Sequence, residues 1–209
     1  ELLRLLAAVP GMPAPLPPAD GVLVGGDLDF DVYRGRRYLP IRLRAPLRAL
    51  FKPLIDDRTR VFAGRRAAIE TVMRFAAGEP GGYLAITAPP GFGKTALVAN
   101  LVAATPEAFA YHFFAPVYGD ETLTEKFFLQ NVVQQMAAWH GHGAELPEAI
   151  NELRALYQKF VDTPLDHQQL LLLDGLDEVA QWSLAPYLSR RLPANLHLVV
   201  TLRDVGQDW

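Results

Sequence analysis

Residues 88–95 read Ala-Pro-Pro-Gly-Phe-Gly-Lys-Thr. This stretch matches the pattern G-x-x-x-x-G-K-[ST], except that Ala88 stands where the first glycine usually does. A loop that wraps its backbone N–H groups around phosphates needs residues without a Cβ, and Gly91 and Gly93 meet that need. Ala88 closes the preceding strand, where a small residue suffices. The stretch therefore predicts a phosphate-binding loop.

The same stretch ends in groups suited to a polyphosphate and its metal ion. Lys94 would place a cation on the β- and γ-phosphates, and Thr95 would offer its hydroxyl to Mg²⁺. An apolar run precedes the loop and helical periodicity follows it, so the phosphates would meet the N-terminus of a helix. The alternative is an ordinary glycine turn in which the lysine stands by chance.

Apolar runs alternate with segments of helical periodicity along the rest of the chain. The apolar runs predict strands at residues 83–87, 109–114, 169–173 and 196–202. Helical spacing predicts helices at residues 67–77, 94–103, 122–139, 147–161 and 178–190. Strands that alternate with helices predict an α/β fold, with a mostly parallel sheet between two helical layers (α/β/α).

The first 60 residues differ in composition, so we expect an N-terminal extension there and a nucleotide-binding domain over residues 61–209. Proline is dense over residues 10–18 and favours an irregular, extended linker. An arginine-rich stretch follows between residues 34 and 48. Such a run is most often a solvated or domain-docking face, although it would also suit an acidic partner or a nucleic-acid backbone.

A second polar group follows the apolar run 169–173. The predicted strand delivers Asp174 to the sheet edge beside the loop, where an ionised carboxylate needs a cation. We therefore expect Asp174 and Thr95 to hold Mg²⁺, with waters between the ion and Asp174. Glu178 would polarise the attacking water, while Asp177 would share that role or cap the next helix. The alternative for Asp174 alone is an aspartate in a turn.

Arg203 ends the last apolar run. In a sheet whose strand carboxyl ends face the ligand, it would lie near the γ-phosphate. There it would report hydrolysis or stabilise developing charge. The alternative is a surface arginine paired with Asp204, and the local sequence leaves the two readings even.

Composition excludes several other classes of protein. The net charge of −3 over 209 residues gives no reason to expect nucleic acid as the main partner. The chain has no cysteine, which excludes disulfides and cysteine-ligated zinc and favours a cytoplasmic location. No apolar run reaches the roughly 20 residues that cross a bilayer, and no signal-peptide layout occurs. His112 lacks partners at metal-ligand spacing, so we expect a core histidine.

The ends of the chain suggest part of a longer polypeptide. It begins at Glu1 without an initiator methionine and stops at Trp209, soon after a predicted strand. A processed complete protein is the alternative.

Three segments resemble one family. Asp174 to Glu178, after four leucines, resembles the Walker B signature of NACHT-type P-loop NTPases. These belong to the STAND class of signal-transduction ATPases and are related to AP-ATPases. Residues 61–65, Val-Phe-Ala-Gly-Arg, are similar to the F-x-G-R segment that opens such domains and lies against the adenine. Residues 201–203 resemble their sensor strand, so the resemblance covers residues 61–205.

The resemblance implies a five-stranded core with the sensor strand between the Walker A and Walker B strands. It implies slow ATP hydrolysis with Mg²⁺, and a switch between an ADP-bound resting form and an ATP-bound oligomer. By motif position Asp174 coordinates the metal, Glu178 activates water and Arg203 senses the γ-phosphate. The family's winged-helix domain is expected after Trp209. The implied nucleotide-binding set is Phe62, Arg65, Pro90, Gly91, Phe92, Gly93, Lys94, Thr95 and Ala96.

The leading hypothesis is therefore the nucleotide-binding oligomerisation module of a larger prokaryotic signalling or antiviral defence protein, with fused effector and sensor domains. We expect a homo-oligomer in the full-length protein, no membrane partner and no nucleic acid on this domain. A nucleotide-gated scaffold without turnover is the second hypothesis, against which Glu178 argues. An AAA-type or helicase-like motor on nucleic acid is the third, and only the arginine-rich stretch supports it.

Overall fold

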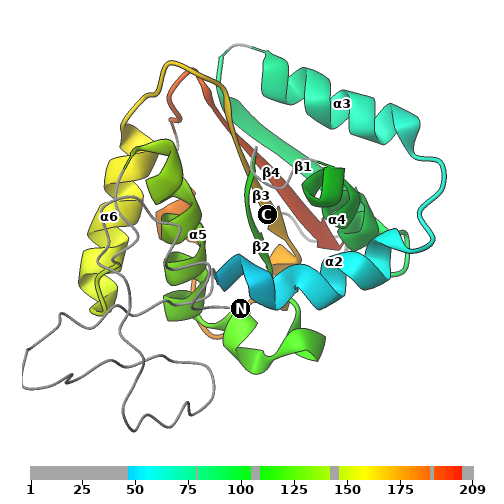
Figure 1. Cartoon of the computed structure of the whole chain (residues 1–209), viewed down its shortest axis with the longest axis horizontal. Helices are drawn as coiled ribbons and strands as arrows, with labels where there is room; N and C mark the ends of the chain where they lie inside the picture. Colours follow the sequence, from blue (N-terminus) through cyan, green and yellow to red (C-terminus); the bar gives the residue numbers. More distant parts are fainter. Residues whose placement is uncertain (1–46, 79, 105–108, 142–145, 189–190, 204–209) are drawn as a thin grey trace, which may run out of the picture. The chain divides into compact units, whose positions relative to one another are not determined.

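The described part of the chain begins at residue 47. The computed structural model describes residues 47–203, apart from residue 79 and the segments 105–108, 142–145 and 189–190 (Figure 1). Every described residue belongs to one compact unit, Pro46–Trp209. The proline-rich stretch, most of the arginine-rich stretch and Asp204 lie outside the described residues.

Four parallel strands form the sheet, in the order β1-β4-β3-β2 (Figure 1). They are β1 (Gly82–Ala88), β2 (Phe109–Phe113), β3 (Gln169–Asp174) and β4 (Leu196–Arg203). All four strands predicted from apolar runs are confirmed. The expected sensor strand, β4, lies between β1 and β3, as the resemblance implies. The resemblance implies five strands, whereas the described residues form four.

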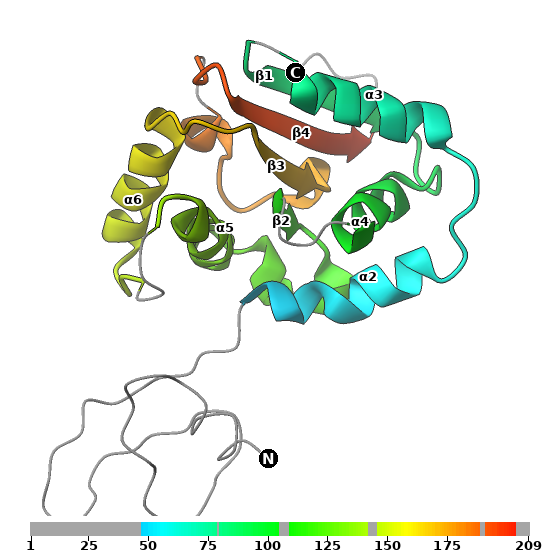
Figure 2. The ribbon, with the colours of Figure 1, turned by 45° about the horizontal axis from the view of Figure 1, so that its top comes forward.

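Helices cover both faces of this sheet. On one side lie α5 (Glu125–Trp139) and α6 (Ile150–Asp162), and on the other lie α2 (Lys52–Thr59), α3 (Arg66–Ala77) and α4 (Lys94–Ala104) (Figures 1 and 2). Alternate residues of a strand point to opposite faces, so Leu198 joins the cluster under α5 and α6 while Val199 joins the other. The predicted three-layer α/β/α fold is confirmed. None of the described helices has the length and apolar character that a bilayer crossing needs.

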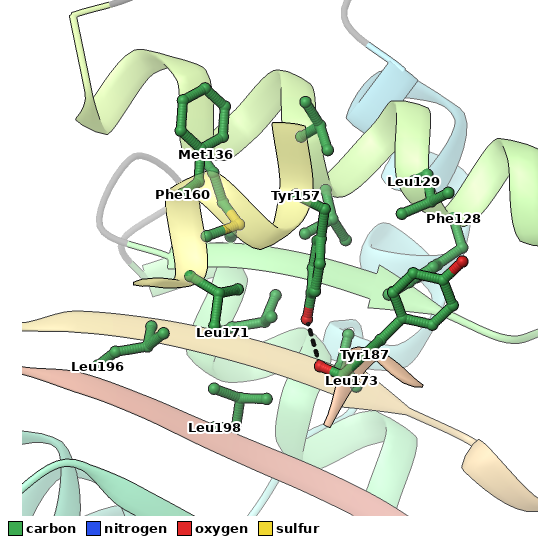
Figure 3. Close-up of a cluster of buried hydrophobic side chains, with 14 of the residues drawn as sticks. Phe128, Leu129, Met136, Tyr157, Phe160, Leu171, Leu173, Tyr187, Leu196 and Leu198 are labelled. Carbon is green, nitrogen blue, oxygen red and sulfur yellow. Dashed lines mark hydrogen bonds between the residues drawn. The ribbon is translucent and has the colours of Figure 1, made fainter. Parts of the chain in front are cut away.

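One core cluster lies between the sheet and helices α5 and α6. Figure 3 shows Phe128 and Met136 of α5 and Tyr157 of α6 gathered over Leu171 of β3. The Tyr157 hydroxyl donates to the carbonyl of Tyr187, 2.9 Å away, so its polar end is satisfied within the core. Burial of such apolar surface is the dominant favourable term in folding.

The segment after β3 differs from the predicted helix at residues 178–190. It forms two short 3-10 turns instead, η4 (Leu176–Glu178) and η5 (Ala185–Tyr187). Trp182 donates its indole N–H to the carbonyl of Leu123, 2.6 Å away, and both Trp182 and Tyr187 contact the ring of Phe128. These contacts with α5 and with the residue Leu123 before it hold the two aromatic residues in an irregular path, so the helix prediction is wrong here.

Residues 47–59 also differ from the irregular extension that we expect over residues 1–60. They form a 3-10 turn, η1 (Leu47–Phe51), and then α2. Phe51 and Leu54 are fully buried in the cluster that includes α4, and the Phe51 ring lies 5.3 Å from that of Phe113. Pro53 stands in the first turn of α2, where a backbone N–H would have no acceptor within the helix, so proline costs no hydrogen bond there. This part of the chain belongs to the packed core.

Candidate functional site

The predicted phosphate-binding loop joins β1 to α4. Gly91 and Gly93 have φ angles of +79° and +75°, which L side chains rarely adopt, so both positions need glycine. Ala88 is the last residue of β1 and pairs with Arg203 of β4. Extended backbone accepts a Cβ, which explains why alanine replaces the first glycine of the motif. Because α4 begins at Lys94, its free N–H groups lie at the loop.

The Lys94 ammonium lies against the loop. Its Nζ donates to the carbonyl oxygen of Ala88 at 2.6 Å and to that of Pro89 at 3.2 Å. These two carbonyl oxygens are neutral acceptors, and a phosphate oxygen is a stronger, charged one. The cation is therefore available to an anion that enters the loop.

Asp174 and Thr95 meet, as the metal-site prediction requires. Asp174 ends β3 and is buried, and its carboxylate accepts a hydrogen bond from the Thr95 side chain. Its Oδ1 also accepts from the Thr201 hydroxyl of β4, 2.6 Å away. Burial raises the pKa of Asp174, while the hydrogen bonds from Thr201 and Thr95 and the charge of Lys94 act in the opposite direction.

These residues fit a magnesium ion. Carboxylate and hydroxyl oxygens are hard ligands that suit Mg²⁺, and Asp174 is only 3% exposed. No group of three or more histidine, cysteine or acidic side chains in the described part of the chain could hold a metal by itself. Thr95 and Asp174 would therefore hold Mg²⁺ together with phosphate oxygens and waters, the usual arrangement for this ion at nucleotide sites.

Arg203 pairs with the acidic residues that follow β3. Its Nε lies 3.0 Å from Asp177 Oδ2, its backbone N–H donates to Asp177 Oδ1 at 3.0 Å, and its Nη2 contacts Glu178 Oε1. The sequence left open a pairing with Asp204, which lies outside the described residues. The strand register sets Arg203 opposite Ala88, so the arginine lies at the same sheet edge as the phosphate-binding loop.

Asp177 and Glu178 are held differently. Both oxygens of Asp177 accept from Arg203, and its side chain is 12% exposed. Glu178 is 30% exposed and meets Arg203 through a single nitrogen of the guanidinium. The short η4 turn also gives Asp177 no α-helix to cap. This geometry favours Glu178 as the candidate base and Asp177 as an anchor for β4.

Arg65 reaches the phosphate-binding loop from the segment before α3. Its Nη2 donates to the carbonyl of Phe92, and a Cβ added to Gly93 would lie 3.5 Å from the same nitrogen. Arg65 has a φ of +60°, an uncommon conformation for a residue with a side chain. The guanidinium therefore lies on the loop, and the nucleotide contact that the resemblance implies for Arg65 stays a prediction. The roles of Phe62, Pro90, Phe92 and Ala96 stay predictions.

Thr201 is a further residue of the site that the sequence pattern did not predict. Its hydroxyl, which is buried, donates to Asp174 and accepts from the backbone N–H of Gly175, 3.0 Å away. The available signal was one hydroxyl near the end of a mostly apolar strand. The hydroxyl can be assigned to the site only when β4 is known to lie beside β3, because Asp174 is at the end of β3.

Two other features lie away from this site. His112 is fully buried, where it accepts from the Asn131 amide at 3.2 Å and donates to the Thr122 carbonyl at 2.8 Å. It is a core histidine, as predicted.

A surface cavity lined by residues 164–168 and by Ala194 and Asn195 opens beyond the amino ends of β3 and β4, at the opposite edge of the sheet.

Comparison with protein families agrees with this geometry. A family model described as an AAA ATPase domain matches residues 61–201, which is more than half of the chain. The matched region contains the phosphate-binding loop, Asp174 and Thr201. A search of curated proteins gives no match. The chain therefore belongs to the AAA ATPase domain family.

Proposed function

We propose that this AAA ATPase domain is a molecular switch that binds ATP with Mg²⁺ and hydrolyses it slowly. The observation that carries the proposal is the meeting of Thr95, Asp174 and Thr201 beside the Lys94 ammonium. A buried carboxylate aligned by two hydroxyl groups next to a phosphate-binding loop suits a complex of Mg²⁺ with a nucleotide polyphosphate.

In the proposed reaction the phosphates lie in the loop, surrounded by its N–H groups. Lys94 leaves the carbonyl oxygens of Ala88 and Pro89 for the β- and γ-phosphates. Mg²⁺, when bound, neutralises charge that develops on the phosphate oxygens. The oxygen of the attacking water forms a bond to the γ-phosphorus and gives a proton to Glu178, while the bond from the γ-phosphorus to the bridging oxygen breaks, which releases ADP and phosphate. Arg203 stabilises charge on the terminal phosphate.

Two further observations support the switch role and the STAND subclass. The sequences of residues 174–178 and 201–203, which resemble the Walker B and sensor segments of that class, support the NACHT-like assignment. The pairing of Glu178 with Arg203 supports slow turnover, because Arg203 Nη2 occupies Glu178 Oε1, an oxygen that the attacking water would have to approach. Oligomerisation with ATP, fused effector and sensor domains and a place in defence signalling belong to the same proposal.

Phosphate release from Mg²⁺–ATP tests the proposal. We expect Glu178→Gln to lower the rate at least about 100-fold, the scale of a lost general base. Asp177→Asn should lower it less, because Asp177 is an anchor. Glu152→Gln, the same change on the exposed surface of α6, serves as the matched control. Tight ATP binding with no hydrolysis by the unmodified domain would instead support the scaffold without turnover.

A further inference from the structure

The end of β4 brings one cation to two carboxylates of the same turn. Arg203 uses its backbone N–H and Nε for Asp177, and its Nη2 for Glu178. The two contacts are unequal, because Asp177 has two bonds at 3.0 Å and Glu178 has one contact near the tip of both side chains. Asp177 thus holds the backbone N–H and Nε of Arg203 in place, while Nη2 of Arg203 can exchange one partner for another.

A second cation, Lys94 of α4, lies at the end of the neighbouring strand β1. Ala88 of β1 lies opposite Arg203, and its carbonyl oxygen accepts from the Lys94 ammonium. Both cations therefore lie at the ends of adjacent strands, each held by an acceptor of the protein itself. A terminal phosphate that enters the loop competes with Glu178 for Arg203, as it competes with the carbonyls for Lys94.

We infer that Arg203 masks Glu178 until a triphosphate arrives. The terminal phosphate takes the Nη2 contact from Glu178, while Asp177 keeps the arginine in place through Nε and the backbone N–H. Glu178 is then released to accept a proton from water. ADP has no third phosphate to make this exchange, so its complex keeps Glu178 masked. The inference rests on the proposed function, since it takes Glu178 as the base and Lys94 as part of the nucleotide site.

The substitution Glu178→Asp separates the exchange from simple charge repulsion. It keeps the negative charge but shortens the side chain by one methylene, so the contact with Nη2 is lost. If the triphosphate must break that contact in order to bind, the shorter side chain makes binding easier. If Glu178 only repels phosphate, the substitution changes little, because the charge remains.

The experiment measures dissociation constants by calorimetry with Mg²⁺, for ADP and for the non-hydrolysable β,γ-imido analogue of ATP. We expect Glu178→Asp to tighten the analogue about twofold to fivefold, the range of an exposed ion pair, and to leave ADP unchanged. In an Arg203→Gln background the same substitution should change neither constant. Glu152→Asp on α6 is the matched control, and thermal unfolding checks that each variant is folded.

Three outcomes overturn the exchange: an unchanged affinity for the analogue, an equal gain for ADP, or a gain that persists in Arg203→Gln. Failure of the proposed function looks different. If the unmodified chain binds neither nucleotide, both ideas fall. If the unmodified chain binds both nucleotides but Glu178→Asp does not tighten the analogue in an Arg203-dependent way, only the proposed exchange is refuted.

Discussion

Thr201→Val tests how much the site depends on one buried hydroxyl. Valine keeps the shape and the strand preference of threonine, so the substitution removes two hydrogen bonds and leaves no cavity. Asp174 loses its donor at 2.6 Å, and the Gly175 N–H loses its acceptor at 3.0 Å. Each buried group left unsatisfied costs about 1–3 kcal/mol, more for a charged one, so we expect a loss of about 3 kcal/mol in unfolding free energy.

Urea denaturation followed by circular dichroism, without nucleotide, measures this loss. Thr201→Ser is the matched control, because it keeps the hydroxyl and removes one methyl group, worth about 1 kcal/mol. A second readout is the Mg²⁺ concentration at half-maximal ATPase activity, which should rise for valine and stay near the original value for serine. If valine proved as stable as serine, the hydroxyl would not be holding Asp174, and this reasoning would fail.

Other expected outcomes follow from single positions. Burial lowers the pKa of His112 from its ordinary 6.5 to about 4, so its contribution to stability is complete above pH 6.5 and is lost as the pH falls through 4. That difference is worth about 3 kcal/mol, and urea titrations against pH should show a flatter profile for His112→Gln. Gly175→Ala should cost about 2 kcal/mol or more in the same assay, because φ is +81° and the new Cβ would lie 2.8 Å from the Phe114 carbonyl oxygen. Gly141→Ala, also at positive φ but with no atom within 4 Å, should cost about 1 kcal/mol, and an equal loss would contradict the steric argument. DNA or RNA at low salt should leave ATPase activity unchanged, and a clear stimulation would favour the motor hypothesis.

Local patterns were enough to predict the strands and the phosphate-binding loop. Four leucines in a row make β3 apolar on both faces, which is the pattern of a strand covered on both sides. The loop is equally local, because Gly91, Gly93 and Lys94 lie within four residues of each other. Both features depend on residues that are neighbours in the sequence, so they can be predicted without knowledge of the tertiary structure.

The contacts that complete the site depend on strand order, which a local pattern does not contain. Thr201 meets Asp174, and Arg203 meets Asp177, only because β4 inserts between β1 and β3. The helix predicted after β3 failed for a similar reason, since Trp182 finds its partners on and beside α5 rather than in its own segment. Distant contacts overrode local preference in each case.

In the proposed function, the phosphate-binding loop and the Lys94 ammonium hold the polyphosphate of the nucleotide. Calorimetric titration of Mg²⁺–ATP into the unmodified chain and into Lys94→Ala tests it most directly, with Lys159→Ala on the exposed surface of α6 as the control. A charge-assisted contact is worth about 1.5–3 kcal/mol, so we expect Lys94→Ala to weaken binding at least about tenfold while the control binds normally. Equal affinity for all three proteins would show that the Lys94 ammonium does not hold the phosphates.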